Sequence, residues 1–119
     1  MTTSGFDAME ARLWAILEPY RGRLEAGSVY GLMTLKWVGT KQHDFFAGVR
    51  VAPNHVAFHL MPVYADPHLL DHVSPTLRKH LKGKTTFNFV AVDEAIFAEL
   101  ADLTARSFET YAEAHQSAP

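Results

Sequence analysis

The middle of the chain contains two short runs with alternating apolar residues, joined by a tight turn. Residues 45–51 (FFAGVRV) and 55–61 (HVAFHLM) place apolar side chains at every second position. A period of two is typical of β-strands, and Pro53 with Asn54 between the runs predicts a hairpin. Strands joined in this way pair antiparallel. This pattern constrains the fold more than any other feature of the chain, and it predicts an antiparallel sheet.

Two further segments extend the predicted sheet to about four or five strands. Residues 28–38 (SVYGLMTLKWV) are rich in strand-forming residues, and residues 84–91 (KTTFNFVA) place apolar side chains at alternate positions. Residues 39–44 lie between two of the strands and are predicted to form a turn. One side of the first segment is expected to face inward, and it carries Val29, Met33, Leu35 and Trp37.

Amphipathic helices are predicted at both ends of the chain. Over residues 6–24 apolar side chains recur three or four positions apart, which forms one apolar helix face. Pro19 is expected to kink this helix or to end its first part, because proline lacks the amide donor that a helix interior needs. A second apolar stripe follows Asp93, a predicted N-cap, and continues to about residue 114.

Two short helical turns are predicted between the third and fourth strands, at Asp66-Pro67 and at Ser74-Pro75, where a capping residue precedes proline. The order is therefore helix, three strands, short helices, strand, long helix. We predict an α+β fold in one domain, residues 1–119, with the terminal helices covering one face of the antiparallel sheet as a two-layer sandwich.

The amino-acid composition excludes several kinds of functional site. The 119 residues include no cysteine, which excludes disulfides, iron–sulfur clusters, zinc–thiolate sites and cysteine nucleophiles. A net charge of -2 lacks the basic excess of a general nucleic-acid-binding protein. Residues 1–14 do not have the pattern of a signal peptide, and no apolar run approaches the roughly 20 residues that span a bilayer. We therefore expect a cytoplasmic protein that binds neither nucleic acid nor membrane.

No catalytic signature stands out in the sequence. Residues 83–86 (GKTT) are similar to the end of a phosphate-binding loop, but that motif needs a glycine where Arg78 stands, and a helix rather than a strand after it. The GxSxG pattern is absent as well. We predict no catalytic residue, and the sequence leaves enzymatic activity open.

The polar side of the predicted strands forms the first candidate site. If the apolar sides face the helices, the opposite face carries Lys36, Arg50, His55, His59, Thr86 and Asn88, with Tyr30 and Phe46 among them. A cationic face lined by aromatic rings suits a small carboxylate or phosphate ligand. We predict a small anionic ligand, and the expected binding residues are Lys36, Arg50, His59, Thr86 and Asn88. The alternatives are a solvated face and a contact between copies in an oligomer.

A second candidate site lies between the third and fourth strands. His68 and His72 are four positions apart on a predicted helix, with Asp71 beside them. This spacing puts two imidazoles on one helix face, within reach of one divalent metal ion. The HExxH pattern is absent, because Leu69 stands in place of its glutamate. His68, Asp71 and His72 are thus the predicted metal ligands, and the alternative is the polar surface of a short connector.

Several features of the second half of the chain match one known group. They are residues 46–50 (FAGVR), 58–62 (FHLMP), 82–84 (KGK) and 87–89 (FNF), and the long helix after Asp93. In these features the chain resembles the YdhG-like superfamily of small bacterial domains, most of which have no known function. The N-terminal half matches only in its helix-then-strand layout. The resemblance implies an α+β fold with helices packed on an antiparallel sheet.

The YdhG-like superfamily has been compared with frataxin-like iron chaperones, so the resemblance also implies metal handling. Frataxins bind iron through acidic residues on their first helix and first strand. Here the first predicted helix offers Asp7, Glu10 and Glu18, and the first predicted strand carries no carboxylate. Three hypotheses follow for this chain: a non-enzymatic binding module with its ligand on the sheet face, iron or other metal handling, and a homodimeric or partner-binding scaffold.

Overall fold

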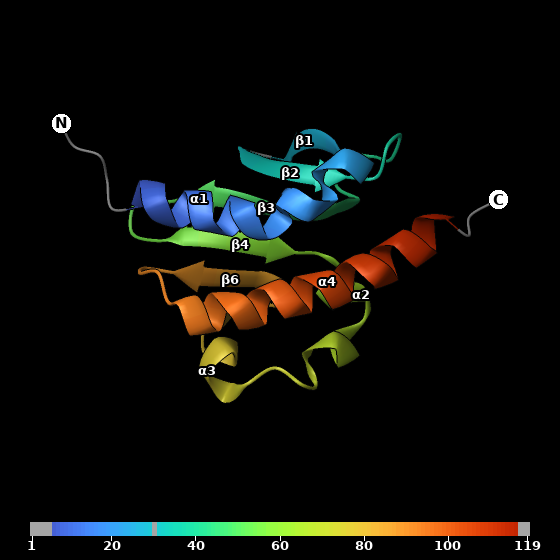
Figure 1. Cartoon of the computed structure of the whole chain (residues 1–119). Coiled ribbons are helices and arrows are strands. Elements are labelled where there is room, and N and C mark those ends of the chain that lie inside the picture. The colour runs from blue at the N-terminus through green and yellow to red at the C-terminus, as the bar shows by residue number, and fades with distance from the viewer. Residues whose placement is uncertain (1–5, 30, 117–119) are drawn as a thin grey trace.

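Six strands form one antiparallel sheet in the computed structural model, which describes residues 6–29 and 31–116 (Figure 1). The strand order is β1-β2-β3-β4-β6-β5. The strands are β1 (Glu25–Val29), β2 (Leu32–Lys36), β3 (Phe45–Val51), β4 (Val56–Leu60), β5 (Leu81–Lys82) and β6 (Thr86–Phe89). The predicted antiparallel sheet is confirmed. The strand count exceeds the expected four to five.

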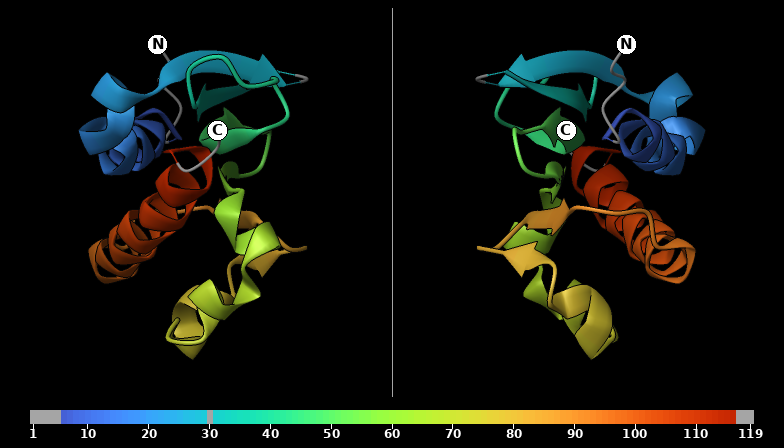
Figure 2. Two further views of the ribbon diagram at one scale, coloured as in Figure 1. Left: turned by 90° about the vertical axis from the view of Figure 1, so that its right-hand side faces the viewer. Right: turned by 90° about the vertical axis from the view of Figure 1, so that its left-hand side faces the viewer.

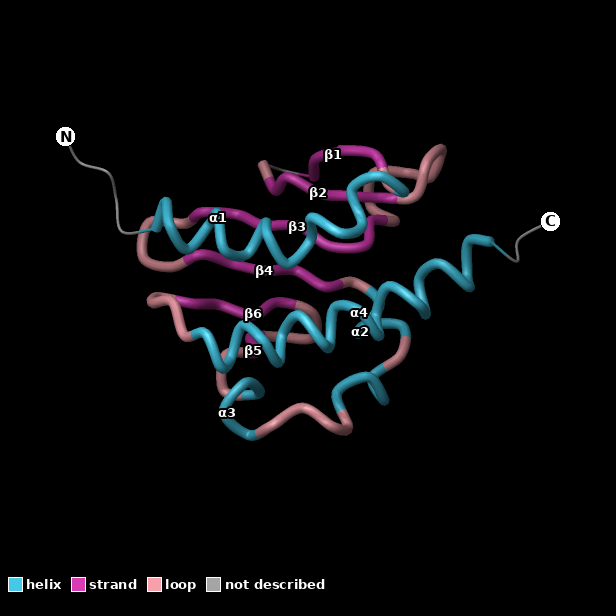
Figure 3. The backbone as a smooth tube through the Cα atoms, viewed as in Figure 1, coloured by secondary structure: helices cyan, strands magenta, loops and turns pink. Residues whose placement is uncertain are grey.

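Two helices cover one face of this sheet. The helical elements are α1 (Phe6–Leu17), the 3-10 helix η1 (Glu18–Arg23), α2 (Pro62–Ala65), the 3-10 helix η2 (Pro67–Leu70), α3 (Pro75–Arg78) and α4 (Glu94–Gln116). Helices α1 and α4 lie side by side on the same side of the sheet (Figures 2 and 3). The predicted α+β architecture is therefore confirmed. We call the sheet face opposite these two helices the open face.

Local sequence signals set several helix ends as predicted. Helix α1 ends at Leu17, two residues before Pro19. The Asp93 carboxylate accepts a hydrogen bond from the amide of Ile96 at the start of α4, with an oxygen–nitrogen distance of 3.2 Å. Such a cap satisfies one of the backbone amides that the first turn of a helix leaves unpaired. The Ser74 hydroxyl caps α3 in the same way.

The hydrophobic core fills the space between the sheet and the helices. Leu13 and Leu17 of α1 and Leu100 of α4 are fully buried there against Phe58 and Leu60 of β4. Each leucine buried in this way stabilises the fold by roughly 1.5–3 kcal/mol through the removal of apolar surface from water. Strand β4 therefore lies at the centre of both the sheet and the core.

The first hairpin differs from the prediction of one strand over residues 28–38. Gly31 has a φ of 86° and lies in a turn, which divides the segment into β1 and β2. Strand β1 starts at Glu25, between the predicted helix of residues 6–24 and the predicted strand of residues 28–38, so the first strand does carry a carboxylate. Met33, expected to face inward, is 53% exposed, because α1 packs chiefly on β3 and β4. Tyr30 lies outside the described residues.

Phe46 is also placed differently from the prediction. The register pairs Leu35 with Ala47 but Lys36 with Phe45, so Phe46 is an extra residue in β3. An extra residue of this kind breaks the alternation of side chains along a strand. The Phe46 ring is fully buried, with centroid distances of 5.3–5.5 Å to the rings of Phe108, Tyr20 and Tyr111. The expectation that Phe46 lies on the open face is therefore wrong.

Candidate functional site

The strand register places four of the predicted ligand-binding residues together on the open face. One row across the sheet runs from Arg50 of β3 through Ala57 of β4 to Asn88 of β6. The neighbouring row brings His59 of β4 beside Thr86 of β6. Paired residues of an antiparallel sheet point to the same face. Arg50, His59, Thr86 and Asn88 therefore surround the small side chain of Ala57.

His59 is the half-buried centre of this group. Its Nδ1 lies 3.1 Å from the Thr86 hydroxyl oxygen. Burial, together with the positive charge of Arg50, lowers the pKa of His59 below its ordinary value. The imidazole is therefore neutral at pH 7. Within the described residues its Nε2 has no hydrogen-bond partner, so this atom is available to a ligand.

Arg50 and Lys82 supply the positive charge at this site. The Arg50 side chain is exposed and has no hydrogen-bond or ion-pair partner in the described part of the chain. Lys82 pairs with Thr86 in the register and is also exposed on the open face. Lys82 was not among the predicted binding residues, although residues 82–84 (KGK) are visibly basic in the sequence.

Asn88 is held in position mainly by hydrogen bonds of its backbone with His80. Its amide donates to the carbonyl oxygen of His80 at 2.9 Å, and its own carbonyl oxygen lies 3.0 Å from Nδ1 of His80. The side-chain oxygen of Asn88 is buried and has no partner among the described residues. Asn88 therefore holds β6 in place beside Ala57 and borders the group of Arg50 and His59.

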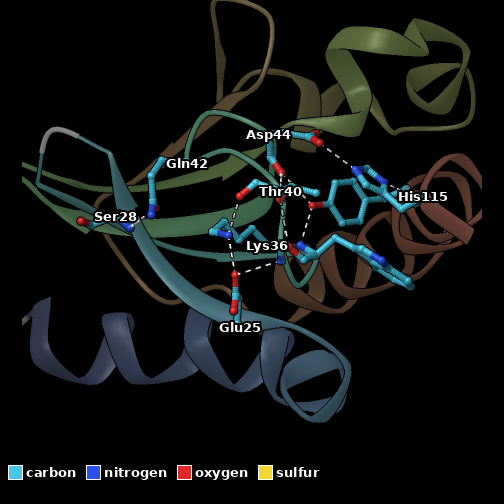
Figure 4. A network of polar contacts seen from close by, with 10 residues as sticks. Glu25, Ser28, Lys36, Thr40, Gln42, Asp44 and His115 are labelled. Atoms are coloured by element: carbon cyan, nitrogen blue, oxygen red, sulfur yellow. Dashed lines mark hydrogen bonds and ion pairs between the residues drawn. The ribbon is translucent and has the colours of Figure 1, made fainter. Parts of the chain in front are cut away.

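Lys36, the fifth predicted ligand-binding residue, is not available to a ligand. Its Nζ lies 2.5 Å from a carboxylate oxygen of Glu25 and 2.7 Å from the carbonyl oxygen of Thr40 (Figure 4). Only 5% of its side chain is exposed. The hydrogen bond from Lys36 also lowers the pKa of Glu25. The expectation of a free Lys36 on the open face is therefore wrong, because a buried ammonium group requires such partners.

The segment of residues 37–44 covers the part of the open face next to Lys36. From this segment the Gln42 side chain reaches β1, where its oxygen accepts a hydrogen bond from the amide of Ser28 at 3.1 Å. A Cβ atom on Gly27 would lie 2.6 Å from the same oxygen, so the close approach depends on glycine. The open face is thus divided into a covered half at β1 and β2 and an accessible half around Ala57.

A second polar group ties the 37–44 segment to the end of α4. The Tyr111 hydroxyl donates to the carbonyl oxygen of Asp44 and accepts from the amide of Trp37, both at 2.8 Å. Burial raises the pKa of Tyr111 to about 12. His115 lies beside it, with Nε2 2.8 Å from the Asp44 carboxylate and Nδ1 2.7 Å from the Tyr111 carbonyl oxygen. We call Tyr111, His115 and Asp44 the α4 network.

This geometry favours the imidazolium form of His115. Both of its ring nitrogens face oxygen atoms that only accept hydrogen bonds, and both can donate only when the ring is doubly protonated. Burial alone would lower the pKa of His115. The hydrogen bonds to Asp44 and to the Tyr111 carbonyl oxygen outweigh burial, and the pKa is raised. Neither nitrogen is left to act on a substrate.

The predicted metal ligands lie on an exposed connector. The 3-10 helix η2 ends at Leu70, so the expectation of His68 and His72 one turn apart on a helix is wrong. His68 instead pairs with Asp71, with 3.0 Å between Nδ1 and the carboxylate. This hydrogen bond raises the pKa of His68. No group of three or more metal-ligating side chains is found within the described residues. Metal binding stays a prediction.

Comparisons with protein-family models, with curated proteins and with solved structures find no match to this chain. The resemblance to the YdhG-like superfamily therefore stays a prediction. In the described part of the chain, no helix has both the length and the apolar character needed to cross a membrane.

Proposed function

We propose that this domain binds a small anion, a carboxylate or a phosphate, on the accessible half of the open face. The observation that carries the proposal is an exposed Arg50 beside His59: among the described residues, neither the Arg50 side chain nor Nε2 of His59 has a partner. A guanidinium group presents several donors in a planar arrangement that matches carboxylate and phosphate oxygens. Lys82 adds a second cation at the end of the neighbouring row.

The arrangement favours binding over catalysis. Thr86 and His59 form a hydroxyl–imidazole pair, which is one element of nucleophilic catalysis. Such catalysis also needs a third group that orients the imidazole, and the described residues place no such group at Nε2. We therefore extend the proposal to a non-enzymatic binding module in the cytoplasm. The homodimer predicted from the sequence is the alternative use of this face, and sedimentation equilibrium tests it.

The experiment is a titration of the 15N-labelled protein with inorganic phosphate and, separately, with succinate at pH 6.5. We expect amide shifts to concentrate on residues 48–50, 57–59 and 86–88. Arg50→Ala is expected to weaken binding at least tenfold, which corresponds to the loss of one charge-assisted hydrogen bond pair. Lys79→Ala is the matched control, because Lys79 is an exposed cation at the C-cap of α3 and is not part of the group around Ala57.

Two results would count against the proposal. One is an anion-induced shift pattern spread evenly over exposed cations, including Lys79, because this indicates screening rather than a site. The other is unchanged affinity in both Arg50→Ala and His59→Ala. A metal-dependent shift at His68 and His72 in place of the anion effect would favour metal handling instead.

A further inference from the structure

A pocket separate from the open face lies at the C-terminal end of α4. It has a volume of about 230 Å³ and is formed by the last turns of α4, by α2 and by the end of the 37–44 segment. Its walls are mostly apolar or aromatic and include Phe45, Met61, Pro62, Tyr64, Tyr111 and Ala114. His43, Asp44, Thr110 and His115 also border it. The pocket has space for a small organic molecule.

Hydrogen-bond accounting shows which chemistry the α4 network leaves for a ligand. The Tyr111 hydroxyl already donates once and accepts once, and both nitrogens of His115 are engaged. The Asp44 carboxylate is the charged acceptor of the α4 network: one oxygen contacts His115, and the other has no partner among the described residues. The Asp44 side chain is 52% exposed. Figure 4 shows Asp44 and His115 pointing toward one another.

Two further features favour a positive ligand in the pocket. Tyr64 is 58% exposed, and the Lys84 ammonium group lies 5.4 Å from the centroid of its ring, so one side of this ring already attracts a cation. Phe45 and Tyr111 also line the pocket, with 5% of each residue exposed. The pocket also borders the last two turns of a helix of 23 residues. The C-terminal end of a helix carries partial negative charge, because its last carbonyl groups lack partners within the helix. His115 offsets part of this charge, since its ring nitrogens face the Tyr111 carbonyl oxygen and the Asp44 carboxylate.

We propose that this pocket binds a small organic cation, an alkyl- or arylammonium compound. The ammonium group lies at the free oxygen of Asp44, and the carbon skeleton packs between Tyr64 and Tyr111. One carboxylate accommodates both His115 and the ligand, since two ionised oxygens accept about four hydrogen bonds. This binding site is independent of the anion site, because it shares none of its residues.

The test uses isothermal titration calorimetry and amide shifts with three probes of similar shape: benzylammonium, benzyl alcohol and benzoate. We expect benzylammonium to bind at least tenfold more tightly than the other two, with shifts at residues 43–45, 61–65 and 110–115. Asp44→Asn is expected to weaken benzylammonium binding about tenfold. Asp102→Asn is the matched control, because Asp102 is an exposed carboxylate on α4 outside the pocket lining.

Because Asp44→Asn also changes the contact with His115, Tyr64→Leu provides a second variant that leaves the α4 network intact. We expect this variant to weaken benzylammonium binding about threefold to fivefold, as for the loss of one exposed ring face. Equal binding of benzyl alcohol, preference for benzoate, or no binding of benzylammonium at tens of millimolar concentration overturns the proposal. Amide shifts caused by benzylammonium that concentrate on residues away from the pocket also overturn the proposal.

Discussion

The Lys36 ammonium group lies 2.5 Å from the Glu25 carboxylate, and the two residues face each other across the first hairpin. Their burial is unequal: 5% of the Lys36 side chain and 41% of the Glu25 side chain are exposed. Loss of Glu25 would therefore leave a buried charge without compensation. Loss of Lys36 would leave a carboxylate that water can solvate.

This asymmetry predicts unequal effects on stability. We expect Glu25→Gln to lower the free energy of unfolding by more than Lys36→Met does, and Lys36→Met to change it by less than about 1 kcal/mol. Urea unfolding followed by circular dichroism measures both. Glu18→Gln, which removes an exposed ion pair with Arg21, serves as the control and is expected to cost no more than about 0.5 kcal/mol. A larger effect for Lys36→Met than for Glu25→Gln would contradict the conclusion that Glu25 compensates the buried charge of Lys36.

The Tyr111 hydroxyl is expected to be important for holding the 37–44 segment. Tyr111→Phe leaves the Trp37 amide and the Asp44 carbonyl oxygen without this partner in a largely buried position. We expect a loss of about 2 kcal/mol in the free energy of unfolding. Amide hydrogen exchange should also become faster at Trp37. Tyr64→Phe removes the hydroxyl of an exposed tyrosine and should leave both measurements nearly unchanged.

The raised pKa of His115 predicts that the contribution of this residue to stability depends on pH. Its folded-state pKa is raised above the unfolded value of about 6.5, so the folded protein binds the proton more tightly. The contribution is complete below the unfolded pKa and is lost as pH rises through the folded pKa. We expect the difference in unfolding free energy between the wild type and His115→Gln to shrink from pH 5.5 to pH 8.5. A difference that grows over this range would show that the sign is wrong.

The lowered pKa of His59 predicts the opposite pH dependence of stability, because burial and the charge of Arg50 lower this pKa in the folded state. Above the unfolded pKa both states are neutral at this residue. As pH falls through the unfolded pKa towards the folded one, His59 makes folding progressively less favourable. NMR titration of the imidazole protons should give a pKa below about 6.5 in the wild type. Arg50→Ala should raise this pKa, whereas Lys79→Ala should not. Addition of phosphate should raise it too, if His59 belongs to the anion site.

Local patterns were sufficient to predict much of the fold. Alternation identified β3 and β4, and Pro53 with Asn54 indicated their hairpin. Pro19 predicted the end of α1, and Asp93 predicted the start of α4. These features depend on a few neighbouring residues, because capping, turn formation and side-chain periodicity act over short distances along the chain.

The candidate site was predictable only in part. The alternation placed Arg50, His59, Thr86 and Asn88 on one face, and the register brings them together as that alternation implied. The alternation failed for Phe46, because one extra residue in β3 turns the Phe46 side chain to the opposite face of the sheet. The alternation also did not predict that the 37–44 segment covers Lys36, because this depends on how the segment folds back over the sheet. Alternation assigns a face, but it does not indicate what covers that face.

The sequence by itself determined an α+β domain with an antiparallel sheet, terminal amphipathic helices and a polar strand face. The tertiary structure decided which polar groups on that face are accessible and formed the pocket at the end of α4. The Tyr111 hydroxyl contacts Trp37 and Asp44, which lie 74 and 67 positions away in the sequence. Such contacts depend on how helix and sheet pack together, and no local pattern encodes the distance between residues so far apart along the chain.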